Sequence, residues 1–139
     1  MAAEDAAWSE LWGLLESVDP ANVELPGYNG EWSLKDLMAH IGSWQAEAVQ
    51  VLEQIRNGTF RREPLDVDGM NGRFYEANKD LPLRVVEAEL WAARTRMLQE
   101  FAHLPEVTPE AEEWFVESGA EHYREHLPQL REWLGKGAA

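Results

Sequence analysis

The sequence predicts an all-α protein built as a four-helix bundle. Apolar residues recur at intervals of three and four in four separate segments, which is the spacing of amphipathic helices that bury one face. No stretch of useful length alternates apolar and polar residues as a strand does. The chain has 139 residues, enough for one hydrophobic core, so we expect residues 1–139 to form a single domain.

The first helix is expected over residues 5–18, because its apolar stripe stops at Pro20, a residue type that helix interiors exclude. The second helix is expected over residues 33–57, with Gly58 suited to its C-terminus. The polar loop "ANVELPGYNGE" lies between them and shows no periodicity. Long loops after the first and second helices allow a crossover connection in the bundle.

The start of the second helix, "WSLKDL", is the clearest local signal in the chain. Ser33 is a natural N-cap, and Asp36 lies three residues further on, where it completes a capping box. Trp32 and Leu37 occupy the two positions of a hydrophobic staple.

The third helix is expected over residues 82–103, since Pro82 suits a first turn and Pro105 follows the last one. The segment 58–69 has the composition of a loop. Residues 70–80, "MNGRFYEANKD", are a candidate for a short helix before the third one.

The fourth helix is expected over residues 109–135, because Thr108 is a suitable N-cap and Pro109 suits the first helical position. The sequence leaves open whether this helix is interrupted near Ser118-Gly119. Pro128 lacks a backbone N–H, so we expect it to remove one helical hydrogen bond and to kink the helix beyond His126.

The composition excludes several classes of function. The chain has 26 acidic and 12 basic residues, a net charge of −14, which argues against nucleic acid or anionic lipid as a partner. It has no long apolar run, and "MAAEDAAWSE" lacks the features of a signal peptide, so we expect a cytoplasmic protein that does not enter a membrane. Because the chain has no cysteine, a metal would need nitrogen or oxygen ligands.

The candidate site residues are three of the four histidines. In "EHYREHLPQL", His122 and His126 are four positions apart, so both point the same way from a helix and can chelate one ion. Their spacing from Gly119 and Trp133 places them on or beside the buried face. A pair of surface histidines is the plain alternative for such a spacing.

His40 lies three residues after Leu37 and next to Ile41, which places it on the inward side of the second helix. A lone inward histidine is more often hydrogen-bonded in the core, but facing helices of a bundle also build metal sites. His103 is expected at the last turn of the third helix, where a cation interacts favourably with the helix dipole. We therefore leave it out of the site.

Two groups of acidic residues lie near these histidines. Asp36 is one turn before His40 and can orient its ring, although capping already explains this residue. Glu121 and Glu125 flank the histidine pair and are expected to face away from the metal. No general base is evident at a fixed offset from the histidines, so catalytic residues are not assigned.

The segment "EWSLKDLMAHI", followed about eighty residues later by "EHYREHLPQL", resembles the DinB/YfiT-like superfamily. The resemblance extends from the first helix to Leu134. It implies a four-helix bundle with a divalent metal bound by His40, His122 and His126. The inward helix positions and the spacing of the histidines indicate the same three residues. Relatives in this superfamily include thiol-dependent transferases, maleylpyruvate isomerases and hydrolases. The resemblance also implies a homodimer.

Three imidazoles leave an open coordination position, as in catalytic zinc sites. We expect a metal-dependent enzyme acting on a small molecule, either a hydrolase or a transferase or isomerase that uses a low-molecular-weight thiol, with zinc or nickel as the metal. One alternative is a non-catalytic stress protein that binds a metal or small ligand. Another is a metal-free bundle in which ordinary hydrogen bonds satisfy the three histidines.

Overall fold

A computed structural model of the chain describes residues 1–138 and confirms the all-α prediction, with no strand in that range. No helix among these residues is both long enough and apolar enough to span a bilayer. The α-helices are α1 (Ala2–Glu16), α2 (Leu34–Asn57), α3 (Val67–Asn78), α4 (Leu83–Ala102), α5 (Pro109–Ser118) and α6 (Ala120–Trp133). Two further elements are η1 (Pro20–Asn22) and η2 (Leu134–Ala138).

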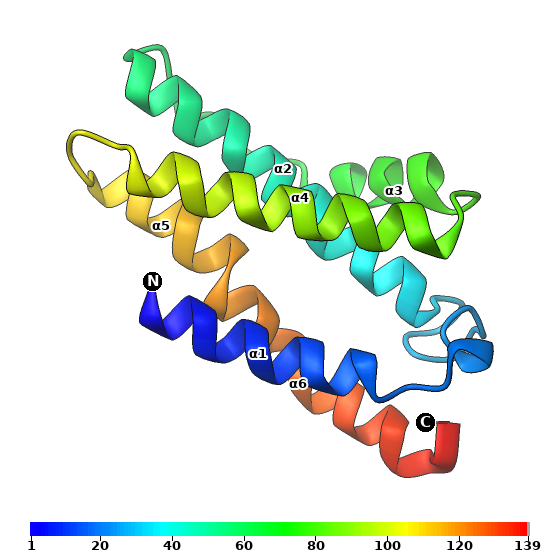
Figure 1. Ribbon diagram of the computed structural model, residues 1–139. Coiled ribbons are helices and arrows are strands. Elements are labelled where there is room, and N and C mark those ends of the chain that lie inside the picture. Colours follow the sequence, from blue (N-terminus) through cyan, green and yellow to red (C-terminus); the bar gives the residue numbers. More distant parts are fainter. Residues whose placement is uncertain (139) are drawn as a thin grey trace.

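The bundle is formed by α1, α2, α4 and the rod made of α5 and α6 (Figure 1). Helices α2 and α4 lie side by side and run in the same direction, while α1 and α6 pair and run the opposite way. The chain returns between α2 and α4 through a crossover that includes α3, as the long loop had allowed. In this topology α6 lies opposite the N-terminal half of α2.

The ends of α2 follow from its sequence. The Ser33 hydroxyl accepts a hydrogen bond from the Asp36 N–H at 3.2 Å, and the Asp36 carboxylate accepts one from the Ser33 N–H at 2.9 Å, so the predicted capping box is present. Gly58 ends the helix with φ at +73°, a left-handed conformation that glycine adopts without a Cβ clash. The predicted bounds of α2 and α4 are correct to within one residue, whereas α1 starts and ends earlier than expected.

The fourth helix is not continuous. Gly119 interrupts it between α5 and α6, which confirms the break that the sequence had left open and corrects the single helix over 109–135. A Cβ at Gly119 would lie 2.8 Å from the Phe115 carbonyl oxygen and 3.3 Å from Cγ of Glu4, so only glycine fits between these groups. Helix α6 then continues through Pro128.

Helix α3 begins earlier than the candidate helix at 70–80, because Asp66 caps it by accepting a hydrogen bond from the Gly69 N–H at 3.0 Å. None of its residues is buried. Three contacts hold it against α2. The Trp44 indole N–H donates to Asn71 at 2.7 Å, the ring of Trp44 packs edge-on against Phe74, and the Asn78 amide donates to the Ser43 hydroxyl at 3.3 Å. Helix α3 is therefore a cover on the surface of the bundle.

One buried polar network joins all four walls of the bundle. Arg94 of α4 forms two hydrogen bonds with the carboxylate of Glu4 in α1, at 2.8 and 2.7 Å. The hydroxyl of Tyr123 in α6 donates to the same carboxylate at 2.8 Å and accepts from Gln45 of α2 at 2.6 Å. Glu4 is 2% exposed, and the Arg94 guanidinium also lies 4.8 Å from the Trp8 ring.

This network yields a first prediction. The variant Glu4→Ala leaves the Arg94 guanidinium largely buried without its carboxylate, so we expect the free energy of unfolding to fall by about 3 kcal/mol in urea denaturation. Asp5→Ala is the matched control. The Asp5 carboxylate is exposed, and its one contact with Arg94 is a longer ion pair of 3.4 Å. It should cost less than about 0.5 kcal/mol. Equal losses in the two variants would contradict the role given to the buried pair.

Candidate metal centre

The structure brings His40 of α2 together with His122 and His126 of α6. One ring nitrogen from each histidine lies within 4.8 Å of the other two. Nε2 of His40 and Nε2 of His122 are 3.1 Å apart, and the three ring centroids are separated by 4.9 to 5.3 Å. Because α6 begins at the Gly119 break, its first two turns carry the two histidines of the pair toward α2.

The arrangement fits a small divalent cation. Two imidazole nitrogens on a tetrahedral zinc ion, each at about 2.0 to 2.1 Å, lie roughly 3.3 Å from one another, close to the separation of the two Nε2 atoms. Nδ1 of His40 and Nε2 of His126 are buried and have no hydrogen-bond partner among the described residues. Buried polar atoms without a partner are costly, and an ion shared with the facing Nε2 atoms of His40 and His122 would supply one for Nε2 of His126, although not for Nδ1 of His40.

Burial keeps these imidazoles uncharged, the form that binds metal. Desolvation lowers the pKa of His40 to about 4, helped by the charge of His126. Desolvation likewise lowers the pKa of His122 to about 3, with the neighbouring histidines adding to the effect. The pKa of His126 is lowered by burial and partly restored by Glu125.

Tyr28 is a part of the site that the sequence analysis missed. Its hydroxyl lies 3.4 Å from Nδ1 of His126 and 3.5 Å from the His126 carbonyl oxygen. Burial raises the pKa of Tyr28 to about 12, so the hydroxyl stays protonated. Gln129 donates to the Tyr28 carbonyl at 3.1 Å and fixes the loop against α6. Tyr28 thus orients the His126 ring, and its aperiodic loop gave no signal for this role.

The other residues considered near the site have different positions. Asp36 is engaged with Ser33, and Nδ1 of His40 lacks a partner, so Asp36 does not orient that ring. His103 is exposed at the end of α4, with Nδ1 2.6 Å from the Gln99 carbonyl oxygen, outside the cluster. Glu125 is exposed but lines the same pocket as His122, so it lies nearer to the site than expected.

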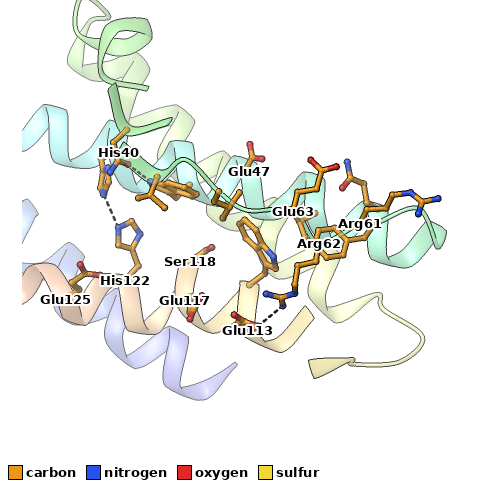
Figure 2. A pocket seen from close by; sticks show the side chains of 18 residues that line it. His40, Glu47, Arg61, Arg62, Glu63, Glu113, Glu117, Ser118, His122 and Glu125 are labelled. Carbon is orange, nitrogen blue, oxygen red and sulfur yellow. Dashed lines mark hydrogen bonds and ion pairs between the residues drawn. The ribbon is translucent and has the colours of Figure 1, made fainter. Parts of the chain in front are cut away.

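A pocket of about 440 Å³ extends from the histidines between α2, the segment after α2, α3 and the α5–α6 rod (Figure 2). His40 and His122 line one end, and Arg61 and Arg62 line the other (Figure 2). This volume suits a small molecule. The histidine cluster is therefore accessible to a ligand from one side.

Comparisons with known proteins agree with this architecture. Residues 5–134 match the family described as the mycothiol maleylpyruvate isomerase N-terminal domain. The crystal structure of an uncharacterised protein from Escherichia coli UTI89 is similar, with a TM-score of 0.82 and 17% sequence identity, covering 98% of this chain and 91% of that chain. At this identity the likeness shows the fold alone. No curated protein matches the sequence.

The lowered pKa values predict how stability depends on pH in protein treated with a chelator. Below about pH 6.5 the unfolded chain takes up protons on its histidines, whereas folded His122 stays neutral until the pH approaches about 3. The free energy of unfolding should therefore fall as the pH is lowered from 7 to 5, with His122 contributing on the order of 2 kcal/mol of that fall.

The measurement is urea denaturation at both pH values for the native chain and for His122→Gln. Titration of carboxylates affects both proteins, so the difference between their losses isolates the histidine. The native chain should lose more stability than the variant. Equal losses would mean that His122 is not held neutral by burial.

Proposed function

Because this chain belongs to the mycothiol maleylpyruvate isomerase N-terminal domain family, we propose that it is a metal-dependent enzyme acting on a small molecule. The observation that carries the proposal is the convergence of three largely buried imidazoles, two of which, those of His40 and His122, line the end of a pocket. His40, His122 and His126 are its metal ligands. The reaction is either a hydrolysis or a transfer or isomerisation that uses a small thiol.

Zinc or nickel is the ion that best suits an all-imidazole site. When bound by three histidines, either ion keeps an open coordination position and supplies Lewis acidity to a water molecule or a thiol. The protein residues hold the three rings neutral and oriented, Tyr28 through its contact with His126. Helix α3 covers the pocket and limits access of solvent.

A thiol co-substrate is supported by two observations. The family description names mycothiol, and the chain has no cysteine of its own, so a sulfur nucleophile would have to enter as a small molecule. The hydrolase alternative needs only water. Comparing turnover of an electrophile with and without added thiol separates the two reactions.

A non-catalytic metal- or ligand-binding protein is the second candidate. It is favoured by the lack of a carboxylate within the histidine cluster in the described part of the chain, which leaves no evident general base. In that case metal binding would persist, but no substrate would be turned over. Activity that disappears on chelation and returns on reloading would rule it out.

The test of the metal site is the metal content and zinc affinity of protein purified without a histidine tag. The native chain should bind one ion per molecule. His40→Ala, His122→Ala and His126→Ala should each lower the affinity by more than about 100-fold, because a lost ligand costs more than a lost supporting contact. His103→Ala is the control and should bind like the native chain.

Two outcomes would contradict the proposal. One is native protein that takes up no zinc or nickel at micromolar concentration. The other is a loss of affinity in His103→Ala equal to that of the three ligand variants, which would indicate metal bound elsewhere on the acidic surface.

A further inference from the structure

The part of the chain between α2 and α4 contributes no buried residue to the core. Every residue from 53 to 85 is exposed or half-buried, although this range includes the end of α2, all of α3 and the segment between them. Residues 61–65 make no hydrogen bond through their backbone within the described part of the chain. Because few buried contacts and backbone hydrogen bonds hold this range, it can open locally while the bundle stays folded.

The contacts that hold this range differ in strength along it. After α3, the largely buried ammonium of Lys35 donates to the Lys79 carbonyl oxygen at 3.1 Å. Before α3, Arg62 pairs with Glu113 of α5 at 2.9 Å, the contact that Figure 2 draws as a dashed line. Both partners of this second contact are exposed, and exposed ion pairs are weak. The segment 59–67, which we call the strap, is therefore the part that opens most easily.

The strap contributes apolar side chains to the pocket. Phe60, Leu65 and Val67 all line it. Leu65 is 48% exposed and Val67 is 47% exposed, so both remain half in water at the edge of the cavity. The other walls include Val51 of α2 and Trp114 of α5. Apolar side chains that are exposed together beside a cavity are typical of a ligand-binding groove.

The size of the pocket indicates what covers these side chains. A helix with a diameter of about 10 Å would fill the volume of about 440 Å³ in roughly one turn, so a segment of another chain does not suit it. A small molecule does. A hydrocarbon or aromatic group of that molecule would remove the apolar side chains from water, and this burial favours binding in proportion to the apolar area covered.

We propose that the substrate carries an uncharged apolar group and that the strap closes on this group through Leu65 and Val67. Breaking the pair between Arg62 and Glu113 opens the strap and admits the molecule. When the pair forms again, Leu65 and Val67 pack on the apolar group and leave water. The inference rests on the proposed function, because it names the substrate class of that same pocket.

The experiment uses three probes that share a hydroxyl group and differ in hydrocarbon length: ethanol, 1-butanol and 1-hexanol. Each is titrated into the ¹⁵N-labelled full chain, once after treatment with a chelator and once after loading with zinc. Binding in the pocket is read from the indole N–H resonances of Trp44 and Trp114, with Trp8 in the core as the internal reference. Zinc content is measured on the same samples.

In both forms of the protein, the affinity should rise about two- to fourfold for each added methylene group. The double variant Leu65→Ala and Val67→Ala should weaken the binding of 1-hexanol by about fivefold and change that of ethanol little. Leu25→Ala with Val107→Ala is the matched control, because these side chains are 50% and 51% exposed and lie outside the pocket. It should bind 1-hexanol like the native chain.

Closure of the strap is measured by amide hydrogen exchange. Saturation with 1-hexanol should slow exchange in residues 61–78 by about threefold or more and leave the buried amides of α2 and α4 unchanged. Without a probe, Arg62→Gln should speed exchange in the same range. Arg131→Gln is the control for this variant, because it removes an exposed ion pair with Glu10 that joins α6 to α1. It should leave exchange in residues 61–78 unchanged.

The inference is overturned if affinity at Trp44 and Trp114 does not rise with hydrocarbon length, if the control pair weakens 1-hexanol as much as the strap variant, or if bound 1-hexanol leaves exchange in the strap unchanged. Its failure is distinguishable from that of the proposed function. Normal zinc binding without a dependence on hydrocarbon length would refute the apolar subsite alone. A dependence on hydrocarbon length in a chain that binds no zinc would refute the metalloenzyme and leave the strap standing.

Discussion

The hydroxyl of Tyr123 joins three helices of the bundle, and the position of the candidate metal centre depends on it. It donates to Glu4 of α1 and accepts from Gln45 of α2, while Glu4 holds Arg94 of α4. Tyr123 follows His122 directly in α6, and Gln45 lies a little more than one turn after His40 in α2. The network therefore fixes the rotation of α6 relative to α2, which determines whether the imidazoles face each other. A small rotation of either helix would separate them.

The two buried polar clusters of the bundle differ in how their charges are balanced. The network around Glu4 contains a carboxylate and a guanidinium with two hydrogen bonds between them, so its charges are paired. The histidine cluster contains no counter-charge, and burial keeps its imidazoles neutral by lowering their pKa values. Two of their ring nitrogens still lack partners. A cation shared with the facing Nε2 atoms of His40 and His122 would give Nε2 of His126 a partner, and this is the physical reason for assigning the cluster to a metal.

Much of this organisation can be predicted from local sequence signals. The capping box at Ser33 and the helical periodicity of α2 and α4 are properties of short segments, and the inward placement of His40, His122 and His126 follows from their spacing. The contacts that depend on tertiary packing cannot be predicted in this way. Tyr28 reaches His126 from an aperiodic loop, and at the Gly119 break the Phe115 carbonyl oxygen and Glu4 leave no room for a side chain. The earlier start of α3 depends on Asp66, whose capping role has no periodic signal.

Anomalous diffraction from crystals soaked with zinc is the most direct test of the metal centre. The structure predicts one anomalous peak among the rings of His40, His122 and His126, with a nitrogen of each at about 2.0 to 2.1 Å. The same experiment on His122→Ala crystals should show no peak there. Rings that diverge too far to share an ion, or zinc found only at surface carboxylates while the cluster stays metal-free, would contradict the assignment and remove the main support for an enzyme.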